Sequence, residues 1–155
     1  MKEFDILIIG AGGAGSAAAI EARKNSTSVC ILCKSLKVNN KTAKAQGGIQ
    51  ASFGEGDSEE NHFKDTLKAG LDNKPKLVKT LVENAKNTVR WLENLGVEFD
   101  KNNNSYILKK GAGMSHARVL SCGDLSGNRI IKPLHKKIKD LKIPVFENCI
   151  VTNIK

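Results

Sequence analysis

The chain has 155 residues, 40% of them hydrophobic, a length that suits a single domain with one ordinary core. Its 25 lysines and arginines outnumber its 16 acidic residues and give a formal net charge of +9. This charge does not indicate a nucleic-acid partner, because the lysines are dispersed, aromatic residues make up only 5%, and no recognition motif is present. No apolar run suits a signal peptide or a membrane helix, so we expect a cytoplasmic protein without direct membrane insertion, associated with membranes only through partner subunits.

The N-terminal part of the sequence has the order of a βαβ unit. An apolar run at 4–10 (FDILIIG) leads into a glycine turn, and a small-residue run at 16–25 precedes a second apolar run at 28–33 (SVCILC). Apolar runs of this length are typical of parallel strands buried on both faces. We therefore expect an α/β fold of Rossmann type, in which a parallel sheet with flanking helices places strand 28–33 between strand 4–10 and a later strand at 143–146 (IPVF).

Three further helices are predicted from capping residues and apolar spacing. The first has Ser58 as its N-cap and Gly70 as its stop, the second follows Pro75 and ends at Gly96, and the third covers 126–140. A proline within the third leaves the position of its first turn open. The apolar residues of the second helix recur every three or four positions and predict a buried stripe: Leu77, Val78, Leu81, Val82, Ala85, Val89, Leu92 and Leu95.

Short strands are expected between and after these helices. The segment 97–108 (VEFDKNNNSYIL) predicts a hairpin whose asparagine run forms the turn. After the last helix, 143–146 and 149–154 (CIVTNI) predict two more strands.

Two of the four cysteines, Cys30 and Cys33, form a C-x-x-C motif within an apolar strand. Residues three apart in a strand face opposite sides of the sheet, and the sequence has neither a second such motif nor a paired histidine motif. We interpret these cysteines as small buried residues, and we predict no metal site.

The hexapeptide GAGGAG contains the pattern G-x-G-x-x-G between an apolar strand and a small-residue helix, which is the context of a dinucleotide-binding turn. Gly10 would form the tight turn, Gly12 would let the backbone approach a pyrophosphate, and Gly15 would let the helix pack closely on the strand. Gly13 and Ala14 lie where the helix N-terminus offers unpaired N–H groups to phosphates. The alternative interpretation is a glycine-rich turn that binds no ligand.

One residue of an ordinary NAD site is missing. An acidic residue normally ends the second strand and binds the ribose hydroxyls, but this sequence has Cys33 followed by Lys34. The difference argues against a typical NAD-binding domain.

Over essentially its whole length the chain resembles the N-terminal part of the flavoprotein subunits of fumarate reductase and succinate dehydrogenase, and of the related L-aspartate oxidases. The segments GAGGAGSAAAIEA, KTAKAQGGIQASF, NHFKDTLKAG, WLENLGVEF and GDLSGNRI occur in the same order in that family. The resemblance implies that residues 1–155 are the N-terminal portion of an FAD-binding domain, without the cap domain and the C-terminal part. It also accounts for Cys33, since family members often have a small residue there.

The same resemblance implies a role for the AQGG segment along the flavin ring of FAD. Glycines at Gly47 and Gly48 would let backbone N–H groups reach the ring, where they stabilise negative charge on its reduced form. Thr42 is expected to supply a hydroxyl contact. The implied cofactor-binding residues are Gly10, Gly12, Gly13, Ala14, Gly15, Cys33, Lys34, Lys41, Thr42, Ala45, Gln46, Gly47, Gly48 and Ile150.

Two departures from the family pattern refine the expectation. Many family members have a histidine before the threonine of this segment that is covalently attached to the flavin, whereas Lys41 precedes Thr42 here. We therefore expect FAD to be bound non-covalently. Gly111 and Met114 stand where the aspartate oxidases have a glutamate and a histidine near the substrate, which argues against L-aspartate oxidase.

No catalytic residue is assigned within the chain. His116 and Arg118 are interpreted as polar residues near the site with structural roles, such as a salt bridge, rather than as catalysts. His62 has Asp65 three residues later on the same predicted helix, which favours a local hydrogen-bonded pair. His135, on a lysine-rich helix, is expected to face solvent.

Three functional interpretations remain open. The first is the FAD-binding portion of an oxidoreductase of fumarate reductase or succinate dehydrogenase type, which transfers hydride between flavin and a small C4 dicarboxylate, with a possible iron–sulfur partner subunit. The others are part of an L-aspartate oxidase and a non-catalytic nucleotide-binding module. We do not expect residues 1–155 to be catalytically active by themselves, and we expect them to bind FAD weakly.

Overall fold

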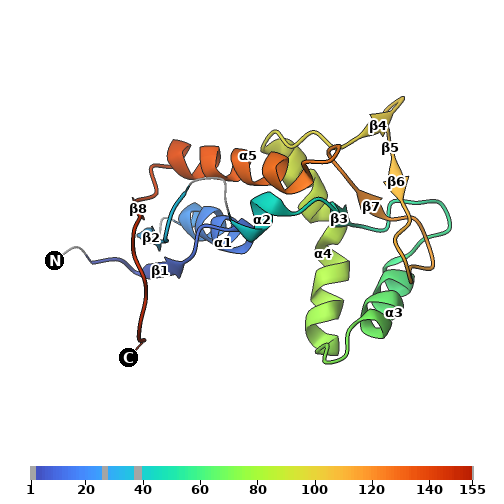
Figure 1. Ribbon diagram of the computed structural model, residues 1–155, viewed down its shortest axis with the longest axis horizontal. Helices are drawn as coiled ribbons and strands as arrows, with labels where there is room; N and C mark the ends of the chain where they lie inside the picture. The colour runs from blue at the N-terminus through green and yellow to red at the C-terminus, as the bar shows by residue number, and fades with distance from the viewer. Residues whose placement is uncertain (1–2, 26–27, 37–39, 155) are drawn as a thin grey trace. The chain divides into compact units, whose positions relative to one another are not determined.

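The computed structural model describes residues 3–25, 28–36 and 40–154 (Figure 1). It divides the chain into two compact units, Met1–Ala45 with Gly127–Lys155, and Gln46–Ser126. Within the described ranges, no helix is both long and apolar enough to cross a membrane.

The first unit contains the predicted parallel sheet. Its strands are β1 (Ile6–Ile9), β2 (Val29–Leu32) and β8 (Val145–Phe146), in the order β1-β2-β8. Both pairings are parallel, and Ile8 of β1 lies opposite Ile31 of β2, whose other neighbour is the first residue of β8. The Rossmann-type α/β fold and the order of its first three strands are therefore confirmed.

Burial differs between the two longer strands of this sheet. Ile31 in the central strand β2 is fully buried, whereas Leu7 and Ile9 in β1 are 53% and 52% exposed. The prediction of burial on both faces holds for β2 and is wrong for β1. The cause is position, because β1 has a neighbour on one side only among the described strands.

Helix α1 (Gly13–Lys24) connects β1 to β2 and lies beside both strands (Figure 1). It begins inside the glycine motif, with Gly12 as its N-cap. Small side chains let it approach the sheet closely, and Ala19 and Ile20 are buried in that contact.

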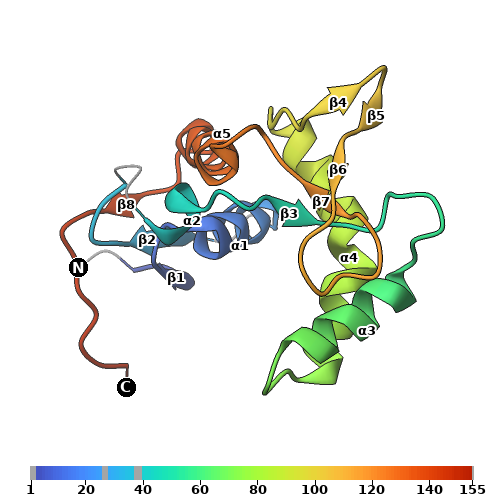
Figure 2. The ribbon, with the colours of Figure 1, turned by 45° about the vertical axis from the view of Figure 1, so that its right-hand side comes forward.

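Helices α2 (Lys41–Lys44) and α5 (Ser126–Asp140) complete the first unit. Both ribbon views show α2 next to α1 and to α5 (Figures 1 and 2). The N–H of Gly127 donates to the carbonyl of Ala45 at 2.8 Å, and a Cβ at this position would overlap the carbonyl oxygen of Thr42. Backbone-to-backbone contact thus fixes α5 against α2. The predicted helix 126–140 is confirmed, with its proline, Pro133, in the interior.

The second predicted C-terminal strand, 149–154, is absent from the structure. After β8 the chain turns at Asn148, whose φ is +58°, and the N–H of Cys149 donates to the carbonyl of Cys33 at 3.0 Å. Beyond that bond no described strand pairs with the segment, and Ile154 is 78% exposed. The sequence CIVTNI has the apolar pattern of a strand. The segment forms none, because no neighbouring described strand is available for hydrogen bonding.

The second unit is built on an antiparallel helix pair, α3 (Glu59–Ala69) and α4 (Pro75–Asn94). The hydroxyl oxygen of Ser58 accepts the N–H of Asn61 at 3.1 Å, and Gly70 is the C-cap, as the sequence predicts. Capping therefore sets the length of α3.

The apolar stripe of α4 is narrower than predicted. Leu77 and Leu81 are 64% and 54% exposed. Each precedes a buried valine, so it is rotated by about 100° from the buried face of the helix. The buried side chains of α4 are Val78, Val82, Ala85, Val89 and Leu92.

A small antiparallel sheet crosses this unit in the order β3-β7-β6, formed by β3 (Ile49–Gln50), β6 (Leu108–Lys109) and β7 (Val119–Leu120). Ile49 of β3 and Leu108 of β6 both lie opposite Leu120 of β7. The sheet therefore fixes the start of the unit, just after the predicted flavin segment, to the segment that ends near residue 120.

The predicted hairpin is confirmed as β4 (Lys101–Asn102) and β5 (Ser105–Tyr106). Its two turn residues, Asn103 and Asn104, have φ of +45° and +66°. Asparagine tolerates this left-handed backbone better than most residues, which is why the asparagine run can form a two-residue turn.

The contact of α5 on α2 predicts that Gly127→Ala is strongly destabilising. The new Cβ must displace backbone atoms of Thr42 rather than a flexible side chain, so we expect a loss of about 1–3 kcal/mol in the free energy of unfolding. Urea unfolding followed by circular dichroism measures the loss. Gly47→Ala is the matched control, because its Cβ meets no atom within 4 Å, and we expect a change within about 0.5 kcal/mol. Equal effects of the two variants would contradict this view of the α5 contact.

Candidate functional site

A pocket of about 410 Å³ lies in the first unit, at the carboxyl ends of β1 and β2. Gly10, Gly12, Cys33, Lys34 and Ile150 all line it, so five residues predicted for the cofactor site come together although they are far apart in the sequence. Crevices at the carboxyl ends of parallel strands are where open α/β sheets bind their ligands.

The glycine turn forms one wall of this pocket. The N–H of Gly10 donates to the carbonyl of Leu32 at 2.8 Å, which fixes the turn to the neighbouring strand. A Cβ at Gly15 would overlap the carbonyl oxygen of Gly10, so only glycine permits this distance between α1 and β1. In contrast, a Cβ at Gly12 would meet only Thr42 Oγ1, at 3.5 Å. Packing within the protein explains the glycine at 15 but does not require the one at 12.

Helix α2 contributes two polar side chains near this turn. Thr42 Oγ1 accepts the N–H of Gly13 at 3.0 Å. Asn40, the N-cap of α2, accepts the N–H of Ala43 through Oδ1 at 2.8 Å, while its buried Nδ2 has no hydrogen-bond partner among the described residues. Asn40 also lines the pocket, so a residue with an unpaired buried donor belongs to the pocket wall. Asn40 is not among the residues predicted from the sequence, although its position just before KTAK is typical of an N-cap.

The far wall is formed where the chain after β8 returns to β2. The N–H groups of Asn148 and Cys149 donate to the carbonyls of Lys34 and Cys33 at 3.1 and 3.0 Å, and Ile150 follows directly. Burial raises the pKa of the Cys33 thiol, and the nearby Glu147 and Cys149 raise it further. The thiol is therefore neutral at pH 7 and cannot replace the missing acid as a charged ribose ligand.

The remaining residues predicted for the flavin belong to different parts of the chain. Ala45 follows α2 in the first unit, whereas Gln46, Gly47 and Gly48 begin the second. Gly48 has φ of +88°, and a Cβ there would overlap the carbonyl oxygen of Leu120, so the fold of the second unit itself requires this glycine. At Gly47 a Cβ would meet no atom within 4 Å. Of these two glycines, only Gly47 is left unexplained by protein contacts.

Arg118 forms the most buried charge network of the described chain. Its side chain is fully buried, and it donates from Nε and an Nη atom to both carboxylate oxygens of Asp57, at 2.9 and 2.8 Å, and from the other Nη to Asp65, at 2.7 Å. The N–H and hydroxyl of Ser115 also donate to Asp65, each at 2.7 Å. The network ties α3 to the segments before and after it, which is the structural role that the sequence analysis favoured for Arg118.

The pKa values of both carboxylates reflect this network. Burial acts to raise the pKa of Asp57, but hydrogen bonds from Arg118 and from the N–H of Ser58, with the charge of Arg118, outweigh burial and lower it. Hydrogen bonds from Ser115, and then the Arg118 guanidinium, hold the pKa of Asp65 well below its usual range. Both carboxylates are therefore ionised at all but strongly acidic pH.

His62 does not form the predicted pair with Asp65, because Ser115 and Arg118 occupy that carboxylate. The imidazole is only 1% exposed, and its Nδ1 lacks a partner among the described residues. Burial lowers the pKa of His62, and the charge of Arg118 lowers it further. The ring is neutral and borders a groove of about 510 Å³ along α3 and α4 that also includes Gly48.

His135 contradicts a second expectation, that it faces solvent. It is half-buried, and its Nε2 lies 2.8 Å from the carbonyl oxygen of Ala11 in the glycine turn. This contact joins residues 124 positions apart, so no local sequence pattern could have predicted it.

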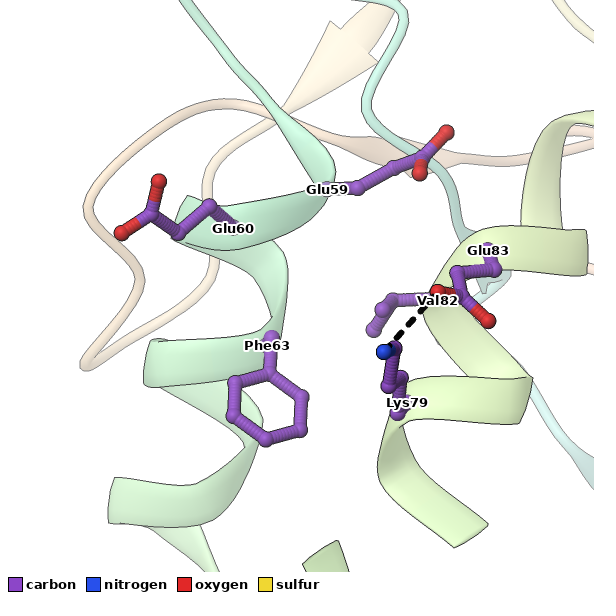
Figure 3. Close-up of a pocket in the computed structure, with 6 residues that line it drawn as sticks. All are labelled: Glu59, Glu60, Phe63, Lys79, Val82 and Glu83. Atoms are coloured by element: carbon purple, nitrogen blue, oxygen red, sulfur yellow. Dashed lines mark ion pairs between the residues drawn. The ribbon is translucent and has the colours of Figure 1, made fainter. Parts of the chain in front are cut away.

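A further groove lies between α3 and α4 in the second unit (Figure 3). Glu59, Glu60 and Phe63 line it from α3, and Lys79, Val82 and Glu83 line it from α4. Its ion pair, Lys79 with Glu83 at 3.8 Å, is exposed, and none of the residues predicted for the cofactor lines this groove. Exposed side chains that pair on one helix do not converge on a ligand, so the pocket of the first unit is the better candidate site.

The chain is similar to known proteins over nearly its whole length. A family model described as an FAD binding domain matches residues 5–155. A chain of the CoM/CoB fumarate reductase of Methanothermobacter marburgensis is 33% identical over 99% of this chain, and an L-aspartate oxidase of Vibrio cholerae is 39% identical over 81% of it. The present chain spans only 29% and 24% of the lengths of these two relatives.

A solved structure shares the fold. The Sdh1 complex of Mycobacterium smegmatis contains a chain that is 32% identical and superimposes with a TM-score of 0.88. The match covers 94% of this chain and 27% of the solved one. The fold described above is thus shared with a chain of this solved complex over nearly all of the present chain.

The Arg118 network predicts a strong dependence of stability on one guanidinium. Arg118→Met leaves two carboxylates without their buried cation, so the free energy of unfolding should fall by about 3–5 kcal/mol. Because both carboxylates have lowered pKa values, their stabilisation of the parent is present above pH ~4 and is lost as pH falls further, so the stability difference between parent and variant should be largest above that pH and shrink below it. Circular dichroism across urea and pH titrations measures both effects.

The control for that prediction is Lys64→Met, which removes an exposed cation from the surface pair with Glu60. Exposed pairs contribute little, so a change within about 0.5 kcal/mol and an unshifted acid transition are expected. If Arg118→Met behaved in the same way, the network would not carry the stability assigned to it.

Proposed function

The chain belongs to the FAD binding domain family, whose cofactor is FAD, and on that premise we propose that it forms part of an oxidoreductase of fumarate reductase and succinate dehydrogenase type. The proposed reaction transfers hydride between the flavin and a C4 dicarboxylate. The observation that carries the assignment of the cofactor site is the pocket at the ends of β1 and β2, where residues from the glycine turn, the end of β2 and the chain after β8 converge.

The residues of this pocket suit an anionic dinucleotide. The N-terminal turn of α1 points its first N–H groups toward the glycine turn, and the N–H of Gly12 has no hydrogen-bond partner among the described residues. Asn40, which lines the pocket, has a second unpaired donor in its buried Nδ2. Unpaired donors are costly when buried, and phosphate or ribose oxygens would satisfy them.

We assign the flavin ring to Ala45, Gln46 and Gly47. FAD supplies the hydride chemistry when it is bound. The open space beside Gly47 supports the assignment, since protein packing does not explain a glycine there. Gly48 does not support the assignment in the same way, because its contact with Leu120 already requires a glycine.

L-aspartate oxidase is the second candidate, and the identity to the Vibrio cholerae protein favours it. Against it stands the pair Gly111 and Met114. The N–H of Gly111 donates to the thioether sulfur of Met114 at 3.3 Å, and a Cβ at Gly111 would approach the Met114 methyl carbon to 2.9 Å. The two departures from the aspartate oxidase pattern thus pack against each other and form one apolar feature in place of an acid and a base.

An iron–sulfur protein is the partner we propose as electron donor or acceptor, by analogy with the family. The Sdh1 structure supports an assembly with other chains, because it is a complex. The dicarboxylate, the direction of transfer and this partner are proposals for the whole enzyme.

The substrate class is tested by turnover of the full-length protein reconstituted with FAD. We expect fumarate to reoxidise a reduced viologen dye in the presence of the enzyme, and L-aspartate with oxygen to give no hydrogen peroxide. Gly12→Asp is the matched variant. A Cβ at this position makes only an ordinary contact with Thr42 Oγ1, but the carboxylate lies beside the phosphate donors, so the variant should lose FAD and turnover while it remains folded. Peroxide from L-aspartate without fumarate reduction would assign the chain to the aspartate oxidases.

The mode of flavin attachment follows from Lys41, the exposed first residue of α2. An amine at this position cannot form the histidyl linkage used by many relatives, so FAD should be released when the holoenzyme is denatured. Denaturing gel electrophoresis with fluorescence detection checks this, and the expected result is no flavin in the protein band. A fluorescent band at the mass of the polypeptide would show that the attachment is covalent.

A further inference from the structure

Two side chains converge on one carbonyl oxygen in the glycine turn. His135 of α5 approaches the oxygen of Ala11 to 2.8 Å through Nε2, and Ser16 of α1 donates to the same oxygen through its hydroxyl at 3.3 Å. Because a carbonyl oxygen only accepts hydrogen bonds, the His135 ring must carry its proton at Nε2. Ala11 is 5% exposed, so these donors replace water at a group that solvent cannot easily reach.

The geometry of the peptide unit links this carbonyl to the proposed phosphate site. In a trans peptide the C=O of one residue and the N–H of the next point in opposite directions within one plane. The C=O of Ala11 points toward His135 and Ser16, so the N–H of Gly12 must point away from them. Gly12 lines the pocket, and its N–H is unpaired among the described residues.

We propose that His135 is a positioning residue for the cofactor. It holds the Ala11–Gly12 peptide in the orientation that keeps the Gly12 N–H available to the pyrophosphate, without touching the cofactor itself. The inference deepens the proposed function and rests on FAD binding in this pocket. Helix α5 then has two roles. Through Gly127 it sets the position of α2, and through His135 it sets the direction of the Gly12 N–H in the glycine turn.

The alternative is that His135 only stabilises the fold. Glycine flanks this peptide, so the Ala11–Gly12 unit has an unusually permissive backbone that can rotate if its carbonyl loses donors. Rotation would bring the carbonyl, rather than the N–H, toward the phosphates, and like-charged oxygens would then repel. A positioning role therefore predicts a loss of affinity for phosphate-bearing ligands that exceeds any loss of stability.

The experiment compares His135→Leu, His135→Gln and Lys136→Leu in the full-length apoprotein. Binding of FAD and of ADP, which carries the pyrophosphate without a flavin ring, is measured by calorimetry, and stability by urea unfolding. Leucine removes the donor but keeps the apolar bulk, so binding of both ligands should weaken by about two- to tenfold. Glutamine carries an N–H donor at a similar reach and should restore most of the affinity. Lys136, exposed on the same helix, should not matter.

Ser16→Ala provides an independent check, because Ser16 shares the acceptor with His135. If both donors hold one peptide, the double variant should lose more affinity than the product of the two single losses, since the carbonyl then has no donor. Unchanged affinity in His135→Leu, or a loss that glutamine does not restore, overturns the positioning role. Absence of FAD and ADP binding by the parent protein would instead overturn the proposed function.

Discussion

Backbone contact at glycine is the constraint on which both units depend. At Gly15, Gly127 and Gly48 a Cβ would overlap a carbonyl oxygen of another segment, so each glycine lets two backbones approach more closely than any side chain would permit. The first sets α1 against β1, the second sets α5 against α2, and the third sets the start of the second unit against β7. The glycine turn and α2, each held by one of the first two contacts, are joined to each other by the hydrogen bond from the N–H of Gly13 to Thr42 Oγ1.

Local patterns in the sequence were enough to predict most elements. The capping by Ser58, the asparagine turn and the order of the parallel strands all depend on residues close in sequence or on rules of chain connection. Gly12, Cys33 and Ile150 line one pocket; Gly12 was predicted for the cofactor site from the spacing of its motif, and Cys33 and Ile150 from family resemblance.

The expectations that proved wrong concern burial and hydrogen-bond partners. Leu77 and Leu81 fit a helical period but fall outside the buried face, and CIVTNI has the composition of a strand without a neighbouring strand. His62 and His135 depend on partners selected by the tertiary fold: Asp65 is bound by Ser115 and Arg118, and Ala11 lies 124 residues before His135. A periodic sequence pattern indicates which residues can be buried. Which of them are buried depends on the segments that pack against them in the folded protein.

The edge of the parallel sheet has a consequence for how the protein behaves in concentrated solution. β1 is four consecutive apolar residues with Leu7 and Ile9 about half exposed, and one side of its backbone ladder has no described partner. Such an edge is a template for strand addition, and apolar side chains beside it favour self-association. The net charge of +9 opposes this at low ionic strength and does so less as salt screens it. Solubility should therefore fall as salt is added, unless another strand covers the edge.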